Sequence, residues 1–181
     1  KHGDGKRGDC IYGGIIDSQN LGEGVHNIRV TVKDEKGSEA TSSGTCKVTK
    51  NVCVPIIENG PPHQKLNIVF VGENYTDLEI LERDAKTHAN FILNVEPFFS
   101  YKDRINFYLV KGHTYFNCST REGTVYCNDD VITRVASQCP LNEIIVLLNT
   151  TEMVGSANPH AYASRLYPEI TLHELGHSLG P

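Results

Sequence analysis

Three short runs of apolar residues, each long enough for one β-strand, restrict the fold of this chain most. They occupy residues 66–71, 105–110 and 142–149, and the last run is the most hydrophobic. Apolar runs without alternation are typical of strands that are buried on both faces. Segments of helical character separate and follow these runs, so the elements have the order βαβαβ and then a helix. This order predicts an α/β layer fold in which residues 142–149 form a central strand.

The segment behind the first run has the periodicity of an amphipathic helix between about residues 77 and 94. Its apolar residues recur at steps of three and four positions, at Leu78, Leu81, Ala85, Ala89 and Ile92. We expect this helix to face the sheet, with Thr76 as its N-cap and Pro97 beyond its end. A second, shorter helix is expected from about 130 to 138, and a final one from about 168 to 179.

Residues 1 to about 50 differ from the rest of the chain, because they are rich in Gly, Lys, Asp and Ser. Residues 25–32 alternate apolar and polar side chains, which predicts a half-buried strand. Turn-forming residues at 34–37 and renewed alternation at 45–49 favour a hairpin. This pattern resembles the closing strands of Ig-like or PKD-like surface modules of bacteria and archaea. We therefore expect residues 1–50 to be the C-terminal part of a β-sandwich module.

Proline and glycine are concentrated in residues 51–64, which we interpret as a linker. Residues 65–181 then form the N-terminal part of a second domain. The sequence starts at Lys1 rather than at Met, and it stops close behind the motif described below. We therefore expect a mature product or a fragment.

Six cysteines occur without a C-x-x-C pair, so they lack the spacing of a cysteine zinc site or a redox motif. Disulfides fit better. Cys118 and Cys127 are close enough to close a small loop, and Cys10 with Cys46 would tie together the first module, although spacing alone leaves the connectivity open. Three Asn-x-Ser/Thr sequons also occur, and glycosylation requires a secretory route. These features predict an oxidising, extracellular location, secreted or at the cell surface.

The charge balance and the lengths of the apolar runs argue against two classes of partner. Lys and Arg number 17 against 22 Asp and Glu, and no basic block is long enough to follow a phosphate backbone. No run approaches the roughly 18 apolar residues that cross a bilayer, and no charged-then-apolar leader opens the sequence. We therefore expect neither nucleic-acid binding nor a transmembrane segment.

The most specific motif is His173-Glu174-Leu175-Gly176-His177, which matches the pattern H-E-x-x-H. On a helix, residues four positions apart lie one turn apart on the same face, so both imidazoles can reach one metal ion. Glu174 projects around the helix from this pair and can act on a water molecule rather than on the metal. The pattern predicts that His173 and His177 bind Zn²⁺. A chance pair of histidines on an amphipathic helix is the alternative, which the scarcity of histidine disfavours.

These residue types at this spacing point to hydrolysis of peptide bonds. Zinc lowers the pKa of a bound water toward about 7, and a neighbouring carboxylate takes up the proton as the water attacks a carbonyl. The carboxylate later delivers the proton to the leaving amine, while the metal stabilises the developing oxyanion. The sequence thus predicts a zinc-dependent endopeptidase with Glu174 as its catalytic base and a protein or peptide as its substrate.

Gly180 extends the motif to H-E-x-x-H-x-x-G, the start of the metzincin pattern, in which a glycine lets the chain turn sharply toward a third ligand. An ordinary helix C-cap is the alternative, and one glycine can serve both roles. The third ligand of that pattern lies three residues past the glycine, so we expect it beyond Pro181. Five upstream residues have suitable side chains but no diagnostic spacing, and we expect structural or exposed roles for them: His113, His160, Asp129, Asp130 and Glu169. The histidines on polar segments, His88 among them, are interpreted in the same way.

From Lys65 onward the chain resembles the immunoglobulin A peptidase family of zinc metallopeptidases. The segments that carry the resemblance are 66–76 (a strand and its turn), 96–98 (a helix exit), 105–108 and 144–149 (two strands) and 173–178 (the zinc motif). The resemblance implies a zincin-like catalytic domain with a mixed sheet and an active-site helix, whose C-terminal part lies beyond this sequence. It also implies zinc dependence and an extracellular endopeptidase role, but not immunoglobulin A as the substrate.

In zincins the strand nearest the site often pairs with the substrate by β-augmentation, and residues 153–158 are the candidate here. A Gly- and Ser-rich loop is the alternative. The competing hypothesis for the whole chain is a non-catalytic surface adhesion or carbohydrate-binding protein with a degenerate zincin-like domain. Glu174 favours catalysis, because a binding protein has no use for a base beside the metal. The first module would then anchor the enzyme at the cell surface or find its substrate.

Overall fold

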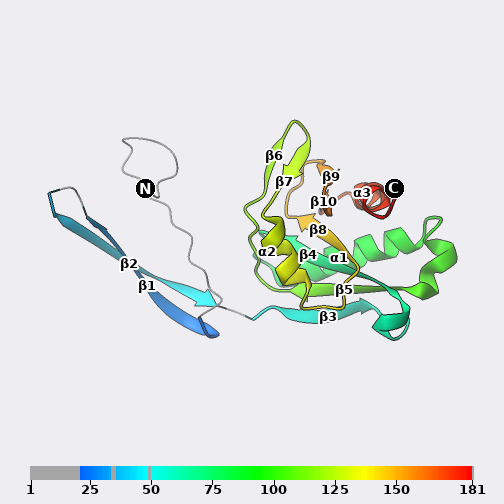
Figure 1. Ribbon diagram of the computed structural model, residues 1–181, viewed down its shortest axis with the longest axis horizontal. Coiled ribbons are helices and arrows are strands. Elements are labelled where there is room, and N and C mark those ends of the chain that lie inside the picture. Colours follow the sequence, from blue (N-terminus) through cyan, green and yellow to red (C-terminus); the bar gives the residue numbers. More distant parts are fainter. Residues whose placement is uncertain (1–20, 34–35, 49, 181) are drawn as a thin grey trace. The chain divides into compact units, whose positions relative to one another are not determined.

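Two units make up the chain, Lys1–Lys50 and Asn51–Pro181. The computed structural model describes residues 21–33, 36–48 and 50–180, and Figure 1 labels their helices and strands. Each unit has its own sheet and is described by itself. Among the described residues, no helix is both long and apolar enough to cross a membrane.

Alternating polarity in the first unit produces a hairpin, as predicted. Strand β1 (Gly24–Lys33) pairs antiparallel with β2 (Glu39–Val48) along its whole length. Gly37, in the connection, has a φ of 88°, a left-handed conformation that glycine adopts without strain. None of the described side chains in these two strands is buried, so the hairpin encloses no core of its own. Its membership of an Ig-like β-sandwich stays a prediction.

Six strands of the second unit form one mixed sheet in the order β3-β5-β4-β8-β10-β9. Their bounds are β3 (Val52–Ile57), β4 (Leu66–Glu73), β5 (Ile105–Lys111), β8 (Glu143–Leu148), β9 (Gly155–Ala157) and β10 (Ala161–Ser164). The four inner strands run parallel, whereas the edge strands β3 and β9 each run antiparallel to their neighbour. The interior position of β8 confirms the prediction for the most hydrophobic run.

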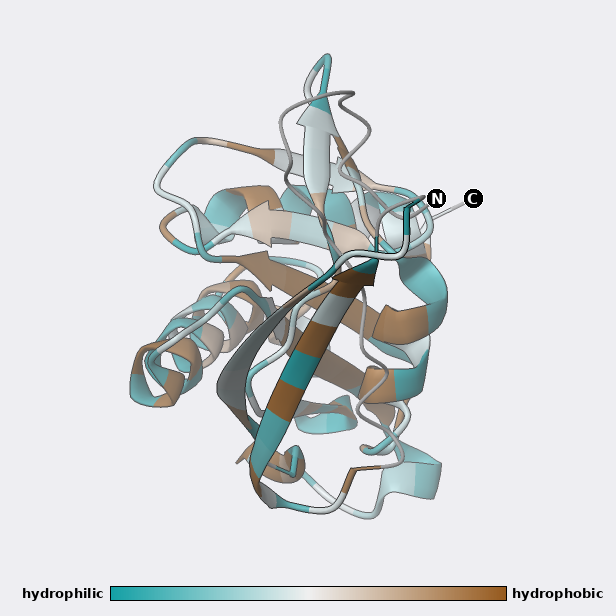
Figure 2. Cartoon of the chain, turned by 90° about the vertical axis from the view of Figure 1, so that its left-hand side faces the viewer, coloured by the Kyte–Doolittle hydropathy of each residue, from teal (hydrophilic) through white to brown (hydrophobic). Residues whose placement is uncertain are grey.

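Helices cover both faces of this sheet, which explains why its inner strands are mostly apolar on both sides (Figures 1 and 2). Helices α1 (Leu78–Leu93) and α3 (Pro168–Leu179) pack on one face, and α2 (Asp129–Ala136) packs on the other. Side chains of β4 alternate between the two cores: Ile68 belongs to the core under α1 and α3, and Val69 to the core under α2. The predicted α/β layers are therefore present.

The helices occupy the predicted segments, with differences at their ends. The apolar stripe of α1 is buried as predicted, at Leu81, Ala85, Ala89 and Ile92. Its N-cap is Asp77 rather than Thr76, because the Asp77 carboxylate accepts hydrogen bonds from the N–H of Glu79 at 2.9 Å and of Ile80 at 3.3 Å. A carboxylate also interacts favourably with the positive end of the helix dipole, which threonine cannot do.

Residues 51–64, predicted to be a linker, contain part of the sheet instead. Strand β3 begins at Val52 and pairs with β5, and a short 3₁₀ helix, η2 (Pro62–Gln64), precedes β4. Pro55 is tolerated in β3 because this is an edge strand whose register with β5 shifts between Pro55 and Ile57. A second 3₁₀ helix, η3 (Phe99–Arg104), leads into β5.

The predicted disulfide between Cys118 and Cys127 is present. It closes a small antiparallel hairpin of β6 (Ser119–Arg121) and β7 (Thr124–Tyr126), which we call the stapled hairpin. Both cysteines pack against the core under α2. The long polar segment between β5 and α2 is therefore a covalently closed insert, as expected.

A second disulfide, which the sequence did not predict, joins Cys53 in β3 to Cys139 behind α2, 86 residues later. Cys46 has no disulfide partner among the described residues, and its expected partner Cys10 lies outside them. Disulfides persist in oxidising compartments, so the two that are present fit the predicted location.

Candidate active site

Helix α3 carries the H-E-x-x-H motif and begins at Pro168, whose fixed φ suits the first helical position. Thr171 and Leu175 are buried, whereas His173 and His177 are exposed. The motif therefore lies on one helix with both imidazoles toward solvent, and the predicted bounds of this helix are confirmed.

Gly180 forms the C-cap of α3, where its N–H donates to the carbonyl of Gly176 at 2.9 Å. The φ of Gly180 is −86° and its ψ is 162°, so the chain leaves the helix in extended backbone. The sequence predicted two roles for Gly180, a helix C-cap and a turn toward a third ligand. The structure shows the C-cap. The turn toward a third ligand concerns residues outside the described range.

The two imidazoles of the motif converge on one point. Nε2 of His173 and Nε2 of His177 are 3.2 Å apart, and the ring centroids are 4.7 Å apart with an angle of 86° between the planes. Two nitrogens that bind one zinc ion tetrahedrally at about 2.0–2.1 Å lie about 3.3 to 3.4 Å from each other. The pair therefore fits a shared zinc ion with only a small adjustment.

No third His, Cys, Asp or Glu completes a metal-binding cluster within the residues that the structure describes. The five upstream candidates have other surroundings: His113 beside a backbone carbonyl, His160 beside α2, Asp129 and Asp130 in the first turn of α2, and Glu169 exposed in the first turn of α3. Structural or exposed roles remain the prediction for all five.

The side chain of Glu174, a residue of α3, lies against the edge strand β9. A Cβ atom on Gly155, the first residue of β9, would lie 2.2 Å from Cγ2 of Ile170 and 3.0 Å from Oε1 of Glu174. Only a glycine therefore lets the strand approach the helix this closely. Among the described strands, β9 pairs with β10 alone, so its other edge is free. The segment 153–158 thus contains the short strand β9, one face of which lies against Glu174, rather than only a loop.

A buried ion pair joins α1 to the segment that leads into α3. Nε of Arg165 lies 2.9 Å from Oδ2 of Asp84, but its N–H is not directed along a hydrogen bond, so the contact is ionic. The hydroxyl of Tyr75 donates to the same oxygen at 3.2 Å, and burial raises the pKa of Tyr75. The side chains of Asp84 and Arg165 are only 8% and 18% exposed, so removal of either charge leaves the other poorly solvated and without its partner.

His88 provides a second link between α1 and α3. Its Nε2 lies 2.9 Å from the carbonyl oxygen of Arg165, and its Nδ1 lies 2.6 Å from Oγ1 of Thr171. Burial lowers the pKa of His88, which favours the neutral ring. Because a carbonyl only accepts, Nε2 carries the proton and Nδ1 accepts from the hydroxyl of Thr171. Thr171 precedes His173 by two residues, so this contact fixes α3 close to the motif.

The sequence left a structural and an exposed role open for His88, and the structure shows the structural one, because this side chain is fully buried. A signal was present in the sequence: Asp84 and His88 are four residues apart and fall within the apolar stripe of α1. Polar side chains in a buried stripe need hydrogen-bonding or charged partners. Periodicity could not identify Arg165 and Thr171 as those partners, since the pairing depends on the tertiary fold.

No protein-family model matches this chain, and no curated protein matches it. The resemblance to the immunoglobulin A peptidase family therefore depends on the quoted segments alone. Membership of that family and the zincin fold stay predictions, and the function has to be argued from the residues on α3 and around it.

Proposed function

We propose that this protein is a zinc-dependent endopeptidase in which His173 and His177 bind the metal and Glu174 is the general base. The main support is the 3.2 Å separation of the two imidazole nitrogens on α3. Two exposed imidazoles gain little from a hydrogen bond to each other in water, so a shared ion is the better explanation of their convergence. A third ligand follows Gly180, as the spacing H-E-x-x-H-x-x-G predicts.

In this proposal the residues around α3 have separate tasks. Bound zinc supplies a Lewis acid that polarises the substrate carbonyl and makes water acidic. Glu174 removes a proton from the attacking water and later donates it to the leaving amine. The free edge of β9 pairs with the substrate backbone, which brings the scissile bond beside Glu174. His88 holds α3 in place through Thr171.

Replacement of Glu174 by glutamine in the full-length protein tests the base. Glu174→Gln should keep the zinc content of the wild type but lose cleavage of a denatured protein mixture by about 100-fold or more, the usual contribution of a general base. A chelator should abolish cleavage by the wild type. The matched control is Glu169→Gln, an exposed glutamate on the same helix, which should keep both properties. Unchanged cleavage by Glu174→Gln would refute the mechanism.

The metal ligands are tested separately from the base. His173→Ala and His177→Ala should each lose zinc on dialysis, as measured by metal analysis, whereas His113→Ala, which removes another exposed imidazole, should retain it. Zinc binding without cleavage of any protein would instead support the competing function, a surface adhesion or carbohydrate-binding protein. The secreted or surface location and the anchoring role of the first unit belong to the same proposal.

A further inference from the structure

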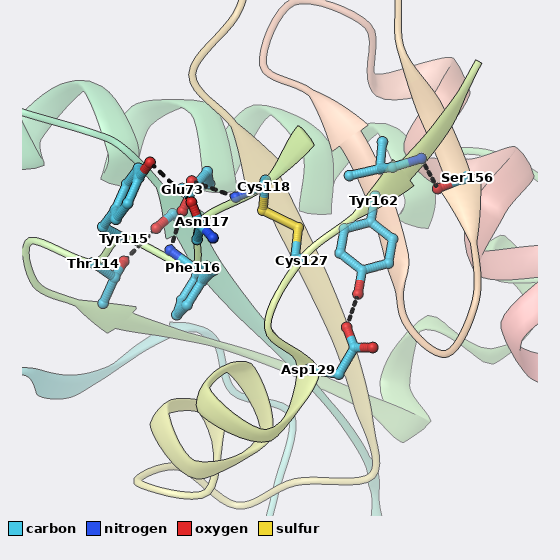
Figure 3. The surroundings of a disulfide bond; sticks show 12 residues. Glu73, Thr114, Tyr115, Phe116, Asn117, Cys118, Cys127, Asp129, Ser156 and Tyr162 are labelled. Carbon is cyan, nitrogen blue, oxygen red and sulfur yellow. Dashed lines mark hydrogen bonds between the residues drawn. A yellow bond between two sulfur atoms is a disulfide. The ribbon is translucent and has the colours of Figure 1, made fainter. Parts of the chain in front are cut away.

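The stapled hairpin is fixed to the sheet at two places. At the carboxyl end of β4, the buried carboxylate of Glu73 accepts the N–H of Phe116 at 2.5 Å and that of Cys118 at 3.2 Å (Figure 3). At the edge of the sheet, the N–H of Val125 in β7 donates to Oγ of Ser156 in β9 at 3.1 Å. The hairpin is therefore held between the end of β4 and the free edge strand.

Strand β9 separates the stapled hairpin from Glu174. Gly155 adjoins Glu174 on the side of α3, whereas its neighbours Val154 and Ser156 belong to the side of the hairpin. This is the alternation of successive strand residues between two faces. A peptide that pairs with the free edge of β9 continues the alternation, so every second peptide side chain points to the hairpin side.

A pocket of about 300 Å³ opens on that side, between the stapled hairpin, the carboxyl ends of β4 and β8, and the segment that leads into β9. Val125, Leu148 and Val154 contribute apolar surface to it, and the exposed side chains of Glu152 and Tyr115 also line it. Within the described residues, neither lysine nor arginine lines it. Because Val154 directly precedes Gly155, the pocket begins one residue from the strand position beside Glu174.

We infer that this pocket binds a lysine or arginine side chain of the peptide substrate, an inference that rests on the proposed peptidase function. The methylene stem of the side chain packs on the apolar wall, and its cationic end meets the carboxylate of Glu152 and the ring face of Tyr115. In strand addition, pockets for alternate side chains provide the specificity. The stapled hairpin thus makes the enzyme selective for peptides with a basic residue near the scissile bond.

Matched peptides that carry either lysine or norleucine at one position test this selectivity. Scanned across the scissile bond, lysine should raise kcat/KM about fivefold at one position, the upper range for a partly exposed ion pair. Glu152→Gln should remove this preference by lowering kcat/KM for the lysine peptide. The matched control is Glu122→Gln, which changes an exposed glutamate of the hairpin turn outside the pocket and should keep the preference.

Binding to the inactive Glu174→Gln protein separates this inference from the proposed function. Tighter binding of the lysine peptide, lost on adding Glu152→Gln, supports the pocket whether or not the wild type cleaves. Equal binding of the two peptides, or a preference that survives Glu152→Gln, overturns the inference. Failure of the zinc-loaded wild type to cleave any peptide overturns the proposed function alone.

Discussion

The two faces of the six-stranded sheet are held by different chemistry. Under α1 and α3, a buried ion pair and a histidine–threonine hydrogen bond connect the helices. Under α2, both disulfides of the described residues pack into the apolar core. Among the residues that the structure describes, one helix of eight residues and a long insert cover that face, so helix packing contributes little there. The comparison indicates that covalent links replace helix packing on one face, while directional polar contacts set the motif helix on the other.

The largest expected effect concerns the covalent face. Cys53→Ala with Cys139→Ala opens a loop of 86 residues and should lower the free energy of unfolding by about 4 to 5 kcal/mol, from loop-closure entropy. Cys118→Ala with Cys127→Ala opens a loop of 9 residues and should cost about 2 to 3 kcal/mol. Denaturant unfolding measures both. Equal costs for the two pairs would contradict an entropic origin.

Removal of the buried cation should weaken the polar face by a similar or smaller amount. Arg165→Met leaves the carboxylate of Asp84 buried without its partner and should cost about 3 to 5 kcal/mol. Adding Asp84→Asn should recover most of the lost stability, because neither charge of the pair is then present. Arg83→Met is the control, since Arg83 is exposed and lies 3.7 Å from the other oxygen of Asp84. A cost for Arg83→Met as large as for Arg165→Met would break the comparison.

The smallest expected effects are opposite pH dependences on the two faces. Burial lowers the pKa of His88. Below about pH 6.5 the unfolded chain therefore binds a proton at this imidazole that the folded chain does not bind. Stability from this group therefore falls as the pH decreases from there. Burial raises the pKa of Glu73 above 4.5, so the folded chain binds a proton at a higher pH than the unfolded chain does. The contribution of Glu73 to stability therefore falls as the pH rises above 4.5 toward the pKa of the folded state.

Urea unfolding across pH 4 to 8 checks both signs at once. His88→Gln should remove the loss of stability on the acid side of about pH 6.5, and Glu73→Gln should remove the loss on raising the pH above 4.5. The slopes with pH are compared rather than the absolute stabilities, because each substitution also alters a hydrogen bond. Unchanged slopes in either variant would show that the group does not titrate differently in the folded state.

The sequence predicted those elements whose pattern is set locally. Apolar periodicity located α1, and a long apolar run located the interior strand β8. It missed β3, because the prolines and glycines of residues 51–64 outweighed its few apolar positions. It also missed β10, and for β9 it left a strand and a loop open, because these strands of four and three mostly small residues exist through pairing with β8 and each other. Strands of this length have no periodicity to recognise.

In the candidate site, too, features set by local geometry were predictable, and contacts between distant residues were not. The spacing of His173 and His177 was sufficient to predict that both lie on one face of α3, because helix geometry alone determines this. The contact of Glu174 with the edge strand and the burial of His88 depend on residues that are distant in the sequence. No local pattern could supply those contacts.

The close approach at Gly155 has a consequence for sequence variation. Any side chain there meets Ile170 and Glu174, so a substitution at Gly155 requires a compensating change on α3. Descendants of this protein that keep the two histidines and the glutamate should therefore keep this glycine, or exchange it together with Ile170. Position 155 and the H-E-x-x-H motif are expected to change together during evolution, although Gly155 lies 18 positions before His173.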